Sequence, residues 1–275
     1  MSGGIVLATT MVGVRPRAGD HRFFIVTAFL MAAIVVSGFS LQLAMGRSTF
    51  RAPLLLHAHA LVFFGWTTFY VLQVALAGTQ SRTLHRRLGW VGAGWAALMV
   101  VLGTVMTVGM IRRGATPFFF QPAYFLVMNV MSVVTFAGLV AAGIALRRRT
   151  AWHRRLLFCG MAVVIGPAFG RLLPMPLLVP HAGWAVFAAL MLLPSAGLVA
   201  DLRRRGRVHP AWWWGMGTIT AAQVATSLIA FSPLGLSLYQ VATAGAPGAR
   251  VAPYAFPPPP AGPAVGQSVG VSEAR

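Results

Sequence analysis

The chain is divided into apolar blocks long enough to cross a lipid bilayer, separated by short segments that carry arginine. A helix needs about 20 apolar residues to cross ~30 Å of hydrocarbon. Charged residues make up only 9% of the sequence, whereas about 25% is usual in a soluble domain. The sequence therefore predicts an all-α protein, a polytopic transmembrane helix bundle of about seven spans, at residues 23–45, 54–77, 89–111, 121–145, 156–173, 182–200 and 212–238.

The segments between the blocks are too short to fold into a domain, so any activity lies in the helix bundle or at its ends. Residues 1–22 are expected to form a cytoplasmic N-terminal segment, and residues 23–240 the bundle. The fifth block contains Gly166 and Pro167, so we expect this span to be broken. Residues 241–275 are rich in Ala, Gly and Pro, a composition that buries too little apolar surface to offset the entropy of ordering. This tail is predicted to be disordered.

Arginine is distributed unevenly between the two sides of the predicted bundle. Positive charge is retained on the cytoplasmic side of membrane proteins, and a cytoplasmic N-terminus places fifteen arginines there against six outside, with Arg171 inside a span. The cytoplasmic set is Arg15, Arg17, Arg22, Arg82, Arg86, Arg87, Arg147, Arg148, Arg149, Arg154, Arg155, Arg203, Arg204, Arg205 and Arg207, and the outer set is Arg47, Arg51, Arg112, Arg113, Arg250 and Arg275. We therefore predict a multi-pass protein of the bacterial inner membrane, with its C-terminal tail outside.

Several classes of function are excluded by the composition. The net charge of +19 comes from arginines between apolar blocks, so the expected partner is the lipid bilayer and not nucleic acid. The sequence has no Lys for a retinal Schiff base. Ion pumps use intramembrane carboxylates, yet the only acids are Asp20, Asp201 and Glu273, and Asp201 is expected to pair with the neighbouring Arg203–Arg205. Any catalytic residues stay unknown at this point.

Histidine and arginine gather at the outer side of the predicted bundle. His57 and His59 begin the second span, His181 begins the sixth, and Arg171 ends the fifth. Residues two apart on a helix point roughly 200° from one another, so only one of His57 and His59 is expected to face the bundle. Because no carboxylate precedes Glu273 on this side, we expect Arg171 to face inward near at least one of the three His, with a ligand as its counter-charge.

The segment His-Arg-Arg-Leu occurs twice, beginning at His85 and at His153, each time at the cytoplasmic start of a span. Imidazoles from different helices can ligate haem iron axially, while arginine pairs with the propionates. Gly89 and Gly160 lie on the same helix faces as the two His and would leave space for the flat macrocycle. The alternative is that interfacial His and Arg contact anionic head groups while the glycines allow close helix packing.

Two hypotheses about function follow. In the first, the protein binds haem b and transfers electrons across the membrane, with quinol or a membrane or periplasmic redox partner as donor or acceptor. Its candidate iron ligands are His59, His85 and His153, and its further cofactor-binding candidates are His57, His181 and Arg171. In the second, the protein is a non-catalytic membrane component that binds a lipid, a small hydrophobic ligand or another membrane protein.

Several strings within about residues 20–225 resemble a widespread family of bacterial inner-membrane proteins whose activity is not established. They are His57-Ala58-His59-Ala60 running to Gln73, Leu84-His85-Arg86-Arg87-Leu88-Gly89, Trp152-His153-Arg154-Arg155-Leu156, Pro167 to Arg171, and Asp201 followed by Arg205-Gly206-Arg207-Val208-His209-Pro210. The resemblance implies a seven-helix inner-membrane fold and names no reaction. More distantly, the hairpin pattern is similar to the cytochrome b561-like haem proteins, a resemblance that implies haem binding.

Overall fold

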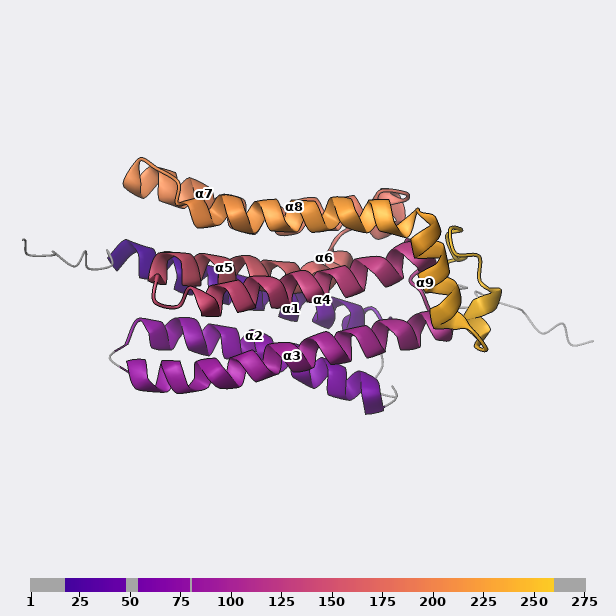
Figure 1. Ribbon diagram of the computed structural model, residues 1–275, viewed down its shortest axis with the longest axis horizontal. Helices are drawn as coiled ribbons and strands as arrows, with labels where there is room; N and C mark the ends of the chain where they lie inside the picture. Colours follow the sequence, from indigo (N-terminus) through magenta and orange to yellow (C-terminus); the bar gives the residue numbers. More distant parts are fainter. Residues whose placement is uncertain (1–17, 48–53, 80, 260–275) are drawn as a thin grey trace, which may run out of the picture.

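The computed structural model describes residues 18–47, 54–79 and 81–259, and every regular element within these ranges is a helix (Figure 1). The α-helices are α1 (Ala18–Ala44), α2 (Leu54–Ala77), α3 (Arg82–Arg112), α4 (Pro122–Ala145), α5 (Thr150–Val164), α6 (Gly166–Leu172), α7 (Ala182–Arg205), α8 (Pro210–Ala230) and α9 (Pro233–Thr243). Two short 3₁₀ helices, η1 (Met175–Leu178) and η2 (Pro247–Arg250), follow α6 and α9. The predicted all-α bundle is thus confirmed.

Five helices, α1, α2, α3, α4 and α7, are each long and apolar enough to cross a membrane. The pairs α5–α6 and α8–α9 reach the required length and hydropathy together, but they bend by 44° and 76°. The described residues therefore contain five candidate spans, or up to seven if each bent pair crosses once. This composition is that of a multi-pass membrane protein, while the cytoplasmic N-terminus and the bacterial inner membrane stay predictions.

Both bends occur where proline removes a backbone donor. Pro167 follows Gly166 at the start of α6, and Pro233 occupies the first position of α9. A proline inside a helix eliminates one hydrogen bond and clashes with the preceding turn, so the expected break in the fifth span is confirmed. The second break was not expected. After it, α9 lies across the end of the bundle instead of continuing the line of α8 (Figure 1).

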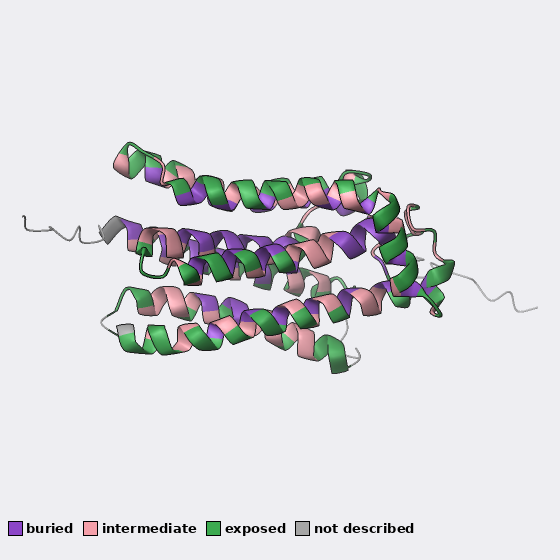
Figure 2. Cartoon of the chain, in the orientation of Figure 1, coloured by how far each residue is buried: buried purple, intermediate pink, exposed green. Residues whose placement is uncertain are grey.

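Helix α4 lies at the centre of the bundle and packs against α3, α5 and α8. Half of its 24 residues are buried, and Figure 2 shows how the buried faces of the helices turn toward one another. Gly160 on α5 faces α4, because a Cβ there would meet Val140 at 3.5 Å and Leu139 at 3.6 Å. Gly160 therefore serves close helix packing, and the expectation that it leaves space for a macrocycle is wrong. By contrast, a Cβ on Gly89 would meet no atom within 4 Å.

The helices extend further than the apolar blocks at the end of the bundle where α1, α3, α5 and α8 begin, which we call the arginine-rich end. There α3 begins at Arg82, α5 begins at Thr150 and α7 continues to Arg205. The apolar count stops at charged residues, but a helix can continue beyond the hydrocarbon into the head groups. As a result His85, His153 and Asp201 all lie within helices, on defined faces.

The segment after α8 differs from the expected disordered tail as far as residue 259. The Tyr239 hydroxyl donates to the Gly248 carbonyl at 2.8 Å, and the Ala123 amide donates to the Pro253 carbonyl at 3.0 Å. Gly248 packs so closely on the Ile111 carbonyl that a Cβ would lie 1.9 Å from it. Composition alone did not show that α3 and α4 present backbone groups to this segment. The part of the tail at residues 260–275 lies outside the described residues.

A topology reporter tests the predicted orientation. An enzyme that is active only outside the cytoplasm should be active when fused after residue 259 and silent when fused after residue 148, because the arginine clusters hold the arginine-rich end inside. Reporter activity normalised to fusion protein abundance is the measurement. The opposite pattern would contradict the orientation, and equal activity at both sites would contradict an odd number of spans between them.

Candidate functional site

The arginine-rich end contains a buried ion pair between α5 and α7. Arg155 is 0% exposed, and its guanidinium binds both oxygens of Asp201, with Nη2–Oδ1 at 2.6 Å and Nε–Oδ2 at 3.0 Å. The Trp212 indole N–H of α8 donates to Asp201 Oδ2 at 3.1 Å, and the His209 amide donates to the same oxygen at 3.3 Å. The bidentate geometry and the additional donors offset the cost of burying both charges. The pair therefore fastens α5, α7 and the start of α8 together.

A second carboxylate extends this network to α1. Asp20 is 4% exposed, and its Oδ2 accepts from Arg154 Nη2 at 2.5 Å and forms an ion pair with Arg205. Arg205 also approaches Asp201, four residues earlier on α7, at 3.9 Å. We call Asp20, Arg154, Arg155, Asp201 and Arg205 the ion-pair network.

The sequence prediction of this network was incomplete. Asp201 was expected to pair with the neighbouring Arg203–Arg205, but its principal partner is Arg155, which is 46 residues away in the sequence. One signal was available, because carboxylates in an apolar bundle are rare and functional by default. What the sequence did not show was the packing of α5 beside α7. Both described carboxylates are occupied by arginine, so neither is free to bind a ligand.

His209 caps the start of α8 beside this network. Its Nδ1 accepts from the Ala211 amide at 3.1 Å, and its ring meets the Trp152 ring edge to face at 5.5 Å. Burial, and then the positive charge of Arg155, lower the pKa of His209 to about 4. The side chain is therefore neutral at pH 7, the state in which Nδ1 can accept the capping hydrogen bond.

The two His-Arg-Arg-Leu histidines also meet at the arginine-rich end, as the prediction of one shared site required. The His85 ring of α3 and the His153 ring of α5 have their centres 6.4 Å apart and are perpendicular, at 89°. His153 Nδ1 lies 2.8 Å from the Gly143 carbonyl of α4. A carbonyl can only accept, so Nδ1 carries the proton and Nε2 keeps its lone pair.

Two buried polar atoms without partners among the described residues belong to His85 and to Gln73. His85 Nδ1 and Gln73 Oε1 are both buried and have no hydrogen-bond partner among the described residues. The backbone of Gln73 on α2 lies beside the His85 ring. Buried polar atoms are normally hydrogen-bonded, and each exception calls for an explanation such as an ion, a water or a ligand. We call His85 and His153, with the Gln73 backbone beside them, the histidine-pair site.

The candidates at the opposite end fall into two groups. Arg171 is half-buried, lies 4.0 Å from the Phe39 ring centre, and donates from Nη1 to the Pro167 carbonyl at 2.8 Å. His59 is also half-buried and lies near enough to Arg171 to interact electrostatically. His57, two residues before His59 on α2, is exposed. The structure therefore brings Arg171 and His59 together, and only one of the His57–His59 pair turns inward, as predicted.

His181 is exposed at the residue before α7 and lines a cavity whose lining does not include His57, His59 or Arg171. The structure thus brings Arg171 near His59, one of the three predicted His, while His181 lines a separate cavity. Across the described ranges, no three His, Cys, Asp or Glu side chains come together as a metal site. His59, near the start of α2, lies toward the other end of the bundle from His85 and His153. One metal ion could therefore be shared by His85 and His153 but not by all three candidates.

Comparison with known proteins adds no family assignment. The chain matches no protein-family model, and neither curated proteins nor solved structures show significant similarity to it.

Substitutions in the ion-pair network test its contribution to stability. R155M should destabilise the protein by about 3–5 kcal/mol, because it leaves Asp201 buried without its partner. The measurement is the free energy of unfolding in mixed detergent micelles. The double variant R155M/D201N should be more stable than R155M, since Asn removes the unpaired charge and still accepts from Trp212. R203A is the matched control, because Arg203 is an exposed arginine on α7, the helix that carries Asp201, and this variant should be nearly neutral. An equal effect of R203A and R155M would contradict the structural role of the pair.

The cap on α8 predicts a pH dependence. The pKa of His209 is lower in the folded protein than its ordinary value of 6.5, so the unfolded chain binds the proton first as the pH falls. The contribution of neutral His209 to the free energy of unfolding is complete above pH 6.5 and is lost as the pH falls through about 4. In H209N, an Asn that caps the helix at every pH should flatten this part of the curve. Unfolding free energies of both proteins between pH 4 and 7 give the comparison, and parallel curves would contradict it.

Proposed function

We propose that the protein is a membrane haem b protein in which His85 and His153 ligate the iron. The observation that supports this proposal is the separation of 6.4 Å between the two ring centres. A metal–imidazole bond is about 2.0–2.1 Å long, so two imidazoles on opposite sides of one ion have ring centres about 6 Å apart. The spacing of the histidine-pair site is therefore one at which both imidazoles could hold the same metal ion.

The hydrogen bonds around the pair are of the kind that support metal ligands. Metal-binding imidazoles usually donate their second ring nitrogen to a carbonyl, which fixes the tautomer and the ring orientation. His153 does so through Gly143, leaving Nε2 as the donor atom. For His85, an iron ion would provide the partner that its buried Nδ1 lacks.

The surroundings limit where a macrocycle could lie. The space beside Gly160 on α5 is filled by side chains of α4, whereas the space beside Gly89 on α3 is open. Of the two glycines, only Gly89 therefore leaves open space beside its histidine. Arg86 and Arg87 follow His85 directly, and Arg147–Arg149 precede α5, so exposed guanidinium groups are available for two propionates. When bound, haem would supply one-electron chemistry, with quinol or a membrane or periplasmic redox protein as the partner class.

An absorption spectrum of the protein purified in detergent tests the proposal. The wild type should show a Soret band and, after reduction, an α-band of the b type. H85A and H153A should each abolish both bands, because one imidazole cannot replace the other's coordination. The amount of protein in the membrane, measured by immunoblot, should be unchanged.

H57A is the matched control, since His57 is an exposed histidine at the opposite end of the bundle, and it should keep the spectrum. A wild-type protein without a Soret band, when produced in haem-sufficient cells, would overturn haem binding. The protein would then be better described as a component that binds a lipid or a small hydrophobic ligand. Bands that survive in both H85A and H153A would instead overturn the assignment of the ligands.

A further inference from the structure

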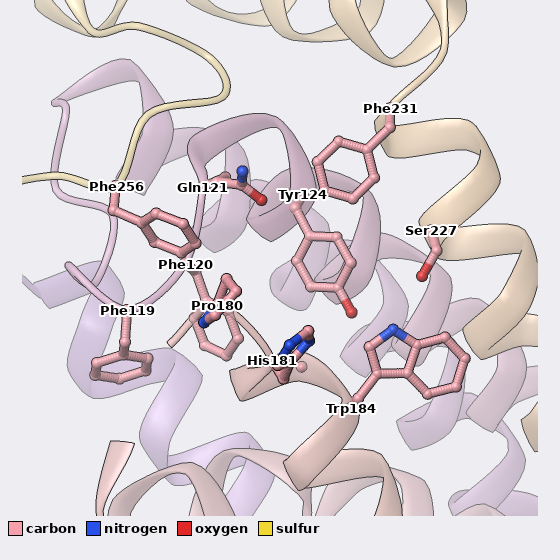
Figure 3. Close-up of a pocket in the computed structure, with 11 residues that line it drawn as sticks. Phe119, Phe120, Gln121, Tyr124, Pro180, His181, Trp184, Ser227, Phe231 and Phe256 are labelled. Atoms are coloured by element: carbon pink, nitrogen blue, oxygen red, sulfur yellow. The ribbon is translucent and has the colours of Figure 1, made fainter. Parts of the chain in front are cut away.

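The end of the bundle opposite the histidine-pair site contains a cavity with a volume of about 240 Å³. It lies between the start of α4, the start of α7 and the last turns of α8. Aromatic rings form most of its wall, and they come from three segments far apart in the sequence (Figure 3): Phe119, Phe120, Phe231 and Phe256. Phe256 belongs to the segment after α9 that packs over this end of the bundle.

Polar groups converge on the same space. Figure 3 shows the Tyr124 hydroxyl, the Ser227 hydroxyl and the Trp184 indole nitrogen turned toward one another, with His181 below them and the phenylalanines to the left and above. Tyr124 Oη accepts from Gln223 Nε2 at 2.9 Å and also interacts with the Ser227 side chain, so these two groups hold the phenol in place at the cavity. Within the described ranges the side chains of Trp184 and His181 have no hydrogen-bond partner.

The composition of the wall selects the chemical class of the occupant. No Arg, Asp or Glu lines the cavity, so a charged ligand would have no counter-charge there. Flat aromatic walls favour a flat ring, and the O–H and N–H donors require acceptor oxygens on it. The volume is below the ~300–1,000 Å³ of pockets for drug-sized ligands, so the occupant is one ring and not a fused system with a bulky substituent.

We propose that this cavity binds a neutral quinone or phenol ring, with Tyr124 and Trp184 donating to its oxygens and His181 at the entrance. The phenylalanines stack on or against the ring and exclude water, while the donors determine its orientation. The site is at the other end of the bundle from His85 and His153, and the proposal does not rest on haem binding.

Tryptophan fluorescence of the full-length protein in detergent, titrated with tetramethyl-1,4-benzoquinone, tests the proposal. Wild type should show saturable quenching. Y124F removes one donor and keeps the ring, so it should raise Kd about fivefold, the factor that corresponds to one net hydrogen bond of ~1 kcal/mol. W184F should remove the largest share of the quenching, because Trp184 touches the ligand. Tetramethylbenzene, which has the same ring and methyl groups without oxygens, should compete poorly.

W213F is the matched control, because Trp213 is exposed on α8 and does not line the cavity. It should leave Kd unchanged and remove only its own share of the signal. H181A changes an exposed side chain, so it tests the site even if Y124F fails to fold, and it should raise Kd. Quenching that does not saturate would overturn the proposal, since it indicates partition into the micelle. A Kd that is the same in wild type, H181A and any folded Y124F would also overturn it.

Discussion

The buried pair of Arg155 and Asp201 is the interaction on which the arrangement of this bundle depends. In an apolar interior the hydrophobic effect does not distinguish one helix neighbour from another, because lipid tails are as apolar as the side chains they would replace. The fully buried guanidinium of Arg155 is far more selective about its neighbours than an apolar side chain. It must find a carboxylate in the right plane, and the carboxylate must find donors for its remaining lone pairs. Trp212 and the His209 amide meet this second requirement, which places α8 beside α5 and α7.

The ion-pair network also separates the two ends of the molecule by chemistry. At the arginine-rich end both described carboxylates are consumed by Arg154, Arg155 and Arg205. His85 and His153 therefore have no acidic partner in the described part of the chain. The Nδ1 atom of His153 lies at a backbone carbonyl, and the Nδ1 atom of His85 has no hydrogen-bond partner among the described residues. Neutral imidazole is the form that ligates metal. The same network that stabilises the fold thus leaves His85 and His153 available as ligands in the proposed haem site.

The opposite end is organised by aromatic rings and by the backbone. Breaks at Gly166-Pro167 and at Pro233 turn α6 and α9 away from the axes of the helices before them. Helix α9 and the segment behind it then cover the ends of α3 and α4, and Phe256 reaches the aromatic cavity. At this end the described part of the chain offers no carboxylate to Arg171, which rests on Phe39 and on the Pro167 carbonyl. The two ends therefore present different binding chemistry, a pair of imidazoles at one and a ring-sized neutral cavity at the other.

The sequence by itself determined the elements of this protein, because membrane spans follow from a local property. A run of apolar residues must be helical in lipid, so the ranges of α2 and α4 agree with the apolar blocks almost to the residue, and the Gly-Pro break in the fifth span was visible. Pairing His85 with His153 also came from a local repeat, His-Arg-Arg-Leu, at equivalent positions of two spans. The helix ends were less certain, since charged turns such as Arg203–Arg205 continue a helix beyond the residues that hydropathy reports.

Only the tertiary structure decided which polar groups meet. The principal partner of Asp201 is Arg155, although Arg203–Arg205 are nearer in the sequence. This pairing arises because α5 packs against α7 and α8, a relation that no local pattern encodes. His181 was expected near Arg171 because both lie at one depth, but depth does not fix the position around the bundle, and His181 lines a cavity that does not include Arg171. The aromatic cavity is assembled from Phe120, Trp184, Phe231 and Phe256, which no spacing in the sequence connects. Spans follow from the local solvent, whereas sites depend on long-range packing between helices that are equally apolar.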